Sequence, residues 1–160
     1  MTDKPPKPQT PPPKWLIRAI VAVHVFLYRL SGGALGARMG KAPVVLLTVK
    51  GRKSGRPITT PLIYVETDRG YAVIASFGGA AKHPIWYLNL KAAGAAEIQI
   101  GAKRQAVRVE EPPIGSDRYV QVWRDAVGVY PEYDAYQART TRPIPIVELV
   151  PGDAALAELT

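Results

Sequence analysis

The sequence predicts an α+β protein built around an antiparallel β-barrel. Runs of strand length, apolar or alternating, follow one another with short polar turns between them. Helical segments stand between these groups of strands and do not alternate with single strands, which is typical of antiparallel α+β folds and not of parallel doubly wound sheets. The length of 160 residues suits one domain with a core of its own.

The N-terminal region divides into a tail and a helix. Residues 1–13 are proline-rich and lack bulky apolar side chains, which predicts a disordered tail, and residues 14–160 are expected to form a single domain. The segment KWLIRAIVAVHVFLYRL (14–30) predicts an amphipathic helix, with Lys14, Arg18 and Arg29 on one stripe of an otherwise apolar surface.

Three interpretations of that helix stay open. It could pack on the domain, or it could lie partly on a membrane surface, as helices with basic edges beside a wide apolar face do. A signal peptide is the third, and the proline-rich leader and Arg18 suit it poorly. Arg18 also interrupts the apolar run too early for a membrane span of about 20 residues.

The rest of the chain reads as two groups of strands with helices after each. Strands are predicted at 43–49, 57–66 and 70–76, and a second hairpin at 95–101 and 103–110. A helix at 83–94 has Pro84 near its start and Gly94 at its end, and Ser116 caps a helix at 117–129 that cannot continue through Pro131. The last strand, 143–150, carries Pro143 and Pro145, which predict a sheet edge.

Charge is concentrated in the N-terminal third. The formal net charge is +8, and residues 1–60 hold eleven basic residues but only one acidic residue, Asp3. Such asymmetry indicates an anionic partner, either a phosphorylated ligand, a nucleic acid or an anionic membrane face, unless it only keeps the surface soluble. Cysteine is absent and the two histidines, His24 and His83, lie far apart, so we expect no metal site.

Three stretches carry the candidate chemistry. The segment GRKSGR (51–56) joins two predicted strands and offers guanidinium groups, an ammonium and a hydroxyl beside flexible glycines, which suits phosphate or carboxylate oxygens. In ASFGG (75–79), a strand ends at two glycines that would let a flat ligand approach the backbone. Tyr130, Tyr133 and Tyr136 are spaced by three, so they form either a packing stripe or a pocket wall.

These stretches, in this order, resemble the deazaflavin-dependent nitroreductase family, which includes the quinone reductases that use coenzyme F420. The resemblance runs from about residue 24 to residue 150 through YRLSGGALG, PVVLLTVKGRKSGRPITTPL, VIASFGGAAKHPIWYLNLKA, VYPEYDAYQ and TRPIPIVELVP. It implies a split β-barrel related to flavin-binding barrels. It also implies an oxidoreductase that transfers hydride from reduced F420, an 8-hydroxy-5-deazaflavin, to a quinone or similar acceptor, with nitroreductase side activity in some members.

The resemblance also implies which residues form the site. The anionic coenzyme tail would be held by the loop residues Arg52, Lys53, Ser54, Gly55 and Arg56. The deazaflavin would be lined by Pro61, Leu62, Ala75, Ser76, Gly78, Gly79, Trp86 and Asn89. The catalytic set would be Ser76, Tyr130, Tyr133 and Tyr136, with the tyrosines closing the acceptor pocket. Ser76, Tyr133 and Tyr136 are the candidate proton donors.

Three positions depart from the family pattern. Phe77 stands where relatives often carry a lysine, and Ile58 where an arginine is common, although Arg56 should face the same side of the strand. Ile63 replaces a tyrosine of the nitroreductase itself, and the neighbouring Tyr64 should point to the opposite face. The first two departures predict a weaker grip on the anionic coenzyme tail. The third predicts a reshaped acceptor pocket and argues against nitro-drug activation.

Two other classes of function were weighed against the reductase. One is a non-catalytic barrel that carries a lipid, a tetrapyrrole or a flavin. The other is nucleic-acid binding, which is not expected, because the cations cluster at one bend and do not alternate with aromatics along a groove. A reductase at the inner face of the cell membrane, in the cytoplasm, with helix 14–30 as a peripheral membrane contact, is the reading that the sequence favours.

Overall fold

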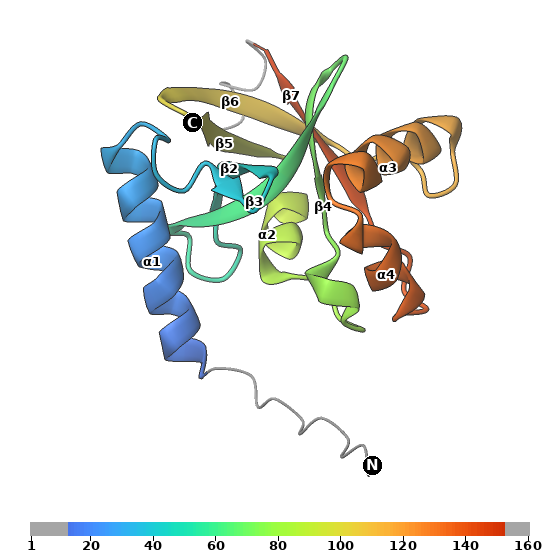
Figure 1. The fold of residues 1–160 in the computed structure, drawn as a ribbon, viewed down its shortest axis with the longest axis horizontal. Helices are drawn as coiled ribbons and strands as arrows, with labels where there is room; N and C mark the ends of the chain where they lie inside the picture. The colour runs from blue at the N-terminus through green and yellow to red at the C-terminus, as the bar shows by residue number, and fades with distance from the viewer. Residues whose placement is uncertain (1–12, 153–160) are drawn as a thin grey trace, which may run out of the picture.

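The computed structural model describes residues 13–152 and shows a closed antiparallel β-barrel of six strands with helices around it (Figure 1). In order around the barrel, the strands are β2 (Ala42–Lys50), β3 (Pro57–Thr67), β4 (Gly70–Ile74), β7 (Ile146–Pro151), β6 (Lys103–Glu110) and β5 (Ala95–Ile100). The barrel closes where β5 pairs with β2, and a two-residue strand, β1 (Arg38–Met39), pairs with the start of β2. The predicted antiparallel barrel is therefore confirmed.

Strand β2 explains why the run PVVLLTV is apolar on both faces. Val45, Leu47 and Val49 point into the barrel core, whereas Val44 and Leu46 point outward into a small cluster beneath the N-terminal helix. A strand that is covered on both faces loses the usual alternation of apolar and polar residues, because each face must be desolvated. The run is apolar throughout because one face of β2 is buried inside the barrel and the other is buried outside it.

Three of the four helices follow the predicted positions, and the short last helix was not among the predicted elements. The helices are α1 (Lys14–Leu30), α2 (Ile85–Ala93), α3 (Asp117–Val129) and α4 (Glu132–Ala138), with a 3-10 turn, η1 (Phe77–Gly79), after β4. Helix α2 begins after Pro84 and ends at Gly94, whose φ of 73° is in the left-handed region, as the sequence predicts. The Ser116 side chain caps α3 by accepting a hydrogen bond from the Tyr119 N–H, 3.2 Å away.

Helix α2 packs against the inner core of the barrel, and α3 and α4 cover part of the outer surface of the barrel. Trp86, Tyr87 and Leu90 of α2 pack in the same core as the inward residues of the strands. A second cluster lies between the barrel and α3 and α4, with Val122 and Tyr133 among its buried members. These two clusters hold the ends of β4, α2 and α4 close to one another, which is where the candidate site lies.

The last strand differs from its prediction. Strand β7 begins at Ile146 and pairs with β4 on one side and with β6 on the other, so it is not a sheet edge. Pro143 and Pro145 precede the strand, and the Pro145 carbonyl accepts the Ala75 N–H at 2.9 Å. Prolines mark an edge in an open sheet because they cannot donate to a neighbour, but here they sit in the approach to the strand and cost no ladder bond.

Helix α1 lies along the outside of the barrel near β3, and most of it is exposed (Figure 1). Tyr28 is the α1 residue that is fully buried, whereas Trp15, Ile20 and Leu30 are 70%, 59% and 73% exposed. The helix therefore packs on the domain through Tyr28, but the expectation that it is buried there does not hold for most of its length. In the described part of the chain, no helix combines the length and apolarity required to cross a bilayer.

The predicted tail lies outside the described residues, except for Pro13, which precedes α1. The single domain predicted over 14–160 stays a prediction, because residues 153–160 also lie outside the described part.

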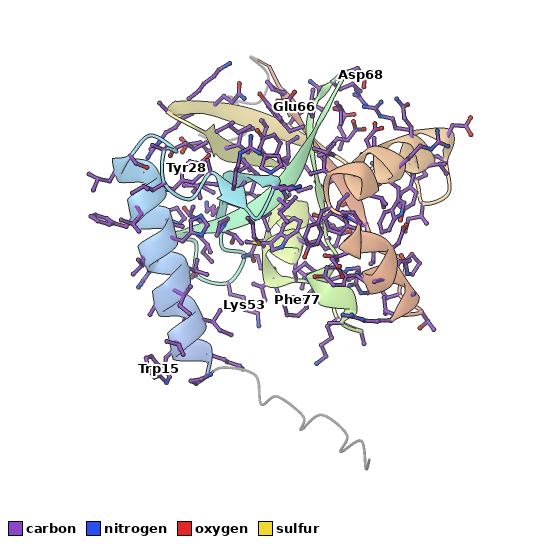
Figure 2. All side chains as sticks on the ribbon, viewed as in Figure 1. Trp15, Tyr28, Lys53, Glu66, Asp68 and Phe77 are labelled. Atoms are coloured by element: carbon purple, nitrogen blue, oxygen red, sulfur yellow. The ribbon has the colours of Figure 1, made fainter. Side chains whose placement is uncertain are left out.

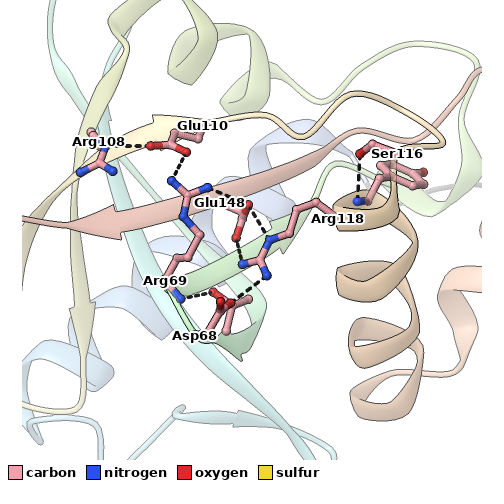
Figure 3. Close-up of polar contacts among 9 residues, drawn as sticks. Asp68, Arg69, Arg108, Glu110, Ser116, Arg118 and Glu148 are labelled. Carbon is pink, nitrogen blue, oxygen red and sulfur yellow. Dashed lines mark hydrogen bonds and ion pairs between the residues drawn. The ribbon is translucent and has the colours of Figure 1, made fainter.

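An ion-pair network fastens α3 to the barrel at the end away from η1 (Figure 3). Glu148 of β7 is 1% exposed and accepts two hydrogen bonds from the Arg118 guanidinium of α3, one of them from Nε at 3.1 Å. Arg118 also pairs with Asp68 at 2.7 Å, and Arg69 lies 3.7 Å from Glu148. The buried carboxylate is thus compensated by two arginines, as a buried charge requires.

Candidate active site

A large cavity opens between α1, β3, the start of α2 and α4. Its volume is about 1200 Å³, and its lining is mainly apolar. The described residues that line it include Arg18 and Arg29 of α1 as the charged members and no acidic side chain. A cavity of this size with a few placed polar groups is the usual form of a small-molecule site.

The middle of the cavity is built by β3 and the first turn of α2. Pro61 and Leu62 of β3 and Trp86 and Asn89 of α2 line it, as predicted for these four residues. Trp86 is 9% exposed and its ring stands edge-on to Tyr87, with the centroids 6.2 Å apart. The indole is therefore held as a rigid wall by the barrel core behind it.

The α4 end of the cavity carries the three tyrosines. Tyr130, Tyr133 and Tyr136 all line the cavity, and their ring centroids are 5.1 to 6.3 Å apart. The hydroxyls of Tyr130 and Tyr136 are hydrogen-bonded at 3.1 Å. The sequence left open whether the three tyrosines form a packing stripe or a pocket wall. They do both, since their rings pack against one another and also line the cavity.

Tyr130 and Tyr133 keep their protons at neutral pH. The Tyr136 hydroxyl, and to a lesser degree burial, raise the pKa of Tyr130 to about 12. Burial raises the pKa of Tyr133 well above its usual range, because a phenolate would lose its hydration in the apolar cluster. Neutral hydroxyls act as hydrogen-bond donors toward an oxygen in the cavity.

The segment after β4 contributes Ser76 and Phe77 to the cavity wall. Ala75 does not line the cavity, because its side chain is fully buried in the barrel core. Gly79 also does not line it: a Cβ there would stand 2.4 Å from the Tyr136 carbonyl oxygen of α4, so the glycine permits helix packing and not close approach of a ligand. Gly78 has open space around it and a φ of 63°, which glycine adopts readily.

The cationic loop lies outside the lining of the cavity. The loop is closed by two backbone hydrogen bonds, from Gly51 N–H to the Arg56 carbonyl and from Gly55 N–H to the Gly51 carbonyl. Arg52, Lys53 and Ser54 are exposed, and Arg56 does not join Ile58 in lining the cavity as the strand register had suggested. Figure 2 shows Lys53 and Phe77 at the same open side of the molecule, below the barrel in that view.

Asn89 connects this loop to α2. Its side-chain oxygen accepts hydrogen bonds from the Arg52 backbone N–H at 3.3 Å and from Arg52 Nη1 at 3.1 Å. Asn89 is 2% exposed, so this amide fixes the base of the loop beside the cavity. The sequence placed Asn89 against a ligand ring, whereas its carbonyl oxygen is already engaged by the loop.

Two cations of the site were missed from the sequence. Arg18 and Arg29 line the cavity from α1, and Arg29 Nη2 donates to the Thr59 hydroxyl at 3.0 Å. The stripe that holds them was visible, but it was interpreted as the edge of a membrane-facing helix. Only the placement of α1 beside β3 reveals that the stripe faces the cavity.

A six-stranded barrel, an apolar slot, cationic groups beside it and neutral phenols at one end define a class: barrels that bind a flat redox coenzyme with an anionic tail. A model of the F420H(2)-dependent quinone reductase family matches residues 20–151. The chain belongs to that family, and it is an oxidoreductase that uses coenzyme F420 and a quinone acceptor.

Individual relatives agree. An F420H(2)-dependent quinone reductase of Mycobacterium tuberculosis is 36% identical over 142 residues, covering 85% of this chain and 95% of that protein. A solved F420-H2 dependent reductase is 39% identical with a TM-score of 0.60, covering 67% of this chain and 93% of that chain. A solved structure described as a domain-swapped dimer is 33% identical with a TM-score of 0.64, covering 86% of this chain and 99% of that chain. These findings favour the reductase over the carrier that the sequence left open.

The residues present fit coenzyme F420. The flat deazaflavin requires an apolar slot, which Pro61, Leu62 and Trp86 supply, and the anionic tail requires cations without competing acids. The cavity lining satisfies the second requirement as well, since its charged members are the two arginines of α1. Among residues 13–152 no group of three or more His, Asp or Glu side chains could hold a metal ion.

Proposed function

We propose that the cavity between α1, β3, α2 and α4 is the site where F420H(2) and a quinone-like acceptor meet. The observation that carries the proposal is the polarity of the cavity, which is lined by the cations Arg18 and Arg29 of α1 and, at the α4 end, by three tyrosines. The 51–56 loop lies outside this lining and is fastened to α2 through Asn89. The bound coenzyme supplies the hydride. The protein supplies orientation, an apolar enclosure and protons.

The anionic part of the coenzyme is held by Arg52, Lys53, Ser54, Gly55 and Arg56, together with Arg18 and Arg29. The guanidinium groups of Arg18 and Arg29 line a cavity without acids, so they attract phosphate and carboxylate oxygens without a competing ion pair. The exposed cations of the loop add to that attraction from outside the lining. Asn89 holds Arg52 in place at the base of the loop. The ring lies against Pro61, Leu62 and Trp86, with Ser76 at its edge. Gly78, which the resemblance assigned to the ring, lies outside the cavity lining, and Ala75 and Gly79 support that wall from behind.

Protons reach the reduced acceptor from the hydroxyl groups at the α4 end. Tyr130 and Tyr136 share a hydrogen bond, so one hydroxyl can donate to an acceptor oxygen while the other supports it. Tyr133 is 5% exposed, and among the described residues its hydroxyl has no hydrogen-bond partner, which leaves that proton for a ligand. The Ser76 hydroxyl is a further donor in the cavity lining.

Phenylalanine replacements test this assignment. We expect Tyr133→Phe and Tyr136→Phe to lower kcat for a water-soluble naphthoquinone about 100- to 10,000-fold, the usual contribution of a positioned general acid, with little change in the Kd for F420. Lys53→Ala should weaken F420 binding and leave kcat nearly intact. Tyr71→Phe, whose hydroxyl belongs to the barrel and not to the cavity, is the matched control. Unchanged turnover in both tyrosine variants would remove the tyrosines from the reaction.

We further propose that nitro compounds are poorer acceptors than quinones. Ile63 lines the cavity where the family nitroreductase has a tyrosine, and Tyr64 points into the barrel core on the opposite face. An aliphatic side chain offers no hydrogen bond to a nitro oxygen. Ile63→Tyr should raise the ratio of nitroimidazole to quinone turnover; an unchanged ratio would contradict this proposal.

The outer face of α1 is proposed to contact an anionic membrane from the cytoplasmic side. Trp15, Ile20, Val23 and Leu27 are exposed there and do not line the cavity. Since α1 also lines the cavity, its contact with lipid would place the cavity beside a lipid-dissolved acceptor.

Vesicle co-sedimentation tests this contact. We expect the full chain to bind vesicles of phosphatidylglycerol and phosphatidylcholine, and Ile20→Glu with Val23→Glu to abolish that binding without loss of soluble-quinone turnover. If the same double variant instead converts a dimer to a monomer and vesicle binding is absent in the parent, the face is a contact between copies and the membrane proposal fails.

A further inference from the structure

The segment between β4 and α2 forms one wall of the cavity but has little regular structure. Ser76 and Phe77 line the cavity from this segment. Phe77 has a φ of 48°, the one non-glycine residue with positive φ in the described part of the chain, and it is 60% exposed. An aromatic residue in that region of backbone space is strained, and such a conformation persists only where surrounding contacts enforce it.

Arg142 supplies those contacts. Its guanidinium donates to three backbone carbonyls of the segment: Nη1 to Ala75 at 3.3 Å, Nη2 to Ser76 at 2.9 Å and Nε to Ala80 at 3.1 Å. Nη1 also lies 3.1 Å from His83 Nδ1. Because the arginine donates only, Nδ1 must accept, which leaves the imidazole neutral with its proton on Nε2.

Arg142 is tied at the same time to the helix that carries the tyrosines. The Gln137 side chain of α4 donates to the Arg142 carbonyl at 3.0 Å, and its oxygen accepts the Ile144 N–H at 3.0 Å. The Arg142 N–H itself donates to the Thr140 hydroxyl at 3.1 Å. One residue therefore joins the Ser76–Phe77 wall of the cavity to the tyrosine wall.

We propose that Arg142 is a positioning residue for the reductase reaction, which fixes Ser76 and Phe77 relative to the tyrosines of α4. The inference rests on the proposed function of the cavity. Arg142 is not among the residues that line the cavity, so it acts through the three carbonyls that it holds. Without the guanidinium, Phe77 is free to leave the positive-φ region, and the wall shifts away from the place where coenzyme and acceptor are oriented. Misplacement of a reacting group by about 1 Å is enough to cost on the order of 100-fold in rate.

The test compares Arg142→Gln and Arg142→Lys with Arg69→Gln. Arg69 also makes several side-chain contacts, with Glu110 and Glu148, but in the network at the other end of the barrel, so it controls for a general loss of stability. Each protein is measured for urea unfolding, hydrogen exchange of residues 75–83, Kd for F420 by fluorescence, and kcat and KM with a water-soluble naphthoquinone. Lysine retains a donor but lacks the planar fork that reaches three carbonyls.

We expect Arg142→Gln to lower kcat at least 10-fold, to speed exchange in residues 75–83, and to leave exchange in β6 unchanged. Arg142→Lys should fold and show an intermediate loss of kcat, which keeps the test valid if the glutamine variant does not fold. Arg69→Gln should keep the parental kcat at temperatures where it is folded. Equal kcat in the Arg142 and Arg69 variants, or unchanged exchange in residues 75–83, would overturn the inference. Failure of the parent protein to reduce the quinone would instead overturn the proposed function, and the exchange measurement would still report on Arg142.

Discussion

Tyr28 shows how one side chain decides the place of a whole helix. It is fully buried, whereas most of α1 is exposed, and its hydroxyl donates to the Val44 carbonyl of β2 at 3.0 Å. The same oxygen accepts the Gly101 N–H at 2.9 Å. These contacts lie where β2 and β5 diverge beyond their few paired residues, so the phenol satisfies backbone groups that the barrel ladder leaves unpaired.

Tyr28→Phe tests this anchor. Removal of the hydroxyl leaves a buried N–H and a buried carbonyl without a partner, which should lower the free energy of unfolding by about 1–3 kcal/mol. Urea denaturation provides the measurement, with Tyr71→Phe as the control. A stability equal to that of the control would show that water replaces the hydroxyl without cost.

At the scale of elements, α1 and the 51–56 loop provide cations from two separate parts of the chain. Arg18 and Arg29 line the cavity, while Arg52 and Lys53 lie in the exposed loop that Asn89 fastens to α2. No described acid lines the cavity, so Arg18 and Arg29 have no ion-pair partner among the residues of the lining. The apolar outer face of α1 is left for a different contact.

Arg18→Gln tests the contribution of α1 to coenzyme binding. An exposed ion pair is worth about 0.2–1 kcal/mol, so the Kd for F420 should rise about two- to five-fold at low salt. The difference should vanish near 0.5 M NaCl, where exposed charges are screened. Arg124→Gln, on the exposed side of α3, serves as the control. Identical affinities of the Arg18 and Arg124 variants at low salt would exclude α1 from the coenzyme site.

At the scale of the whole molecule, closure of the barrel and the Glu148 network determine stability. Each of the six strands has two neighbours, so the described barrel has no free edge among them. Glu148 lies in β7, between β4 and β6, and its pairing with Arg118 holds α3 against that part of the barrel (Figure 3). Helix α4, which lines the cavity and packs with α3 in one cluster, thus depends in part on this ion pair.

Arg118→Met should destabilise the protein strongly, because it leaves the buried Glu148 with only Arg69 nearby. Breaking a buried pair in this way costs about 3–5 kcal/mol, and the residual contact to Arg69 places the expected loss toward the lower value. Arg118→Met combined with Glu148→Leu should be more stable than Arg118→Met alone. A double variant less stable than the single one would contradict this account.

Acid should destabilise the molecule through the same network. A hydrogen bond from Arg118 lowers the pKa of Asp68 below its ordinary 3.8, and one from Arg108 lowers the pKa of Glu110 below its ordinary 4.5. Since the unfolded chain binds these protons more readily, the stabilisation is complete above the ordinary values and is lost as the pH falls through the lowered ones. Urea midpoints should therefore fall steeply below pH 4.5, and Asp68→Asn with Glu110→Gln should flatten that fall. An equally steep fall in the double variant would assign it to other groups.

Much of the fold was predictable because its signals are local. The Ser116 cap, Pro84 and Gly94 set helix boundaries through contacts within a few residues, and the structure confirms them. The edge assigned to Pro143 and Pro145 was wrong because strand pairing depends on partners more than 30 residues away. Within the site, the tyrosines and Trp86 were predicted from their spacing and from the resemblance, whereas Gly79 was given a role that its packing on α4 does not support.

The sequence by itself determined the antiparallel barrel, its helices and the family, because apolar periodicity, caps and ordered motifs are written along the chain. Tertiary structure alone decided that the arginine stripe of α1 faces the cavity, that Asn89 holds the cationic loop, and that Arg142 joins two walls of the site. Each of these depends on where a side chain meets a segment distant in sequence. Contacts of this kind are determined by the closure of the barrel and the packing of its helices, and a local sequence pattern does not predict them.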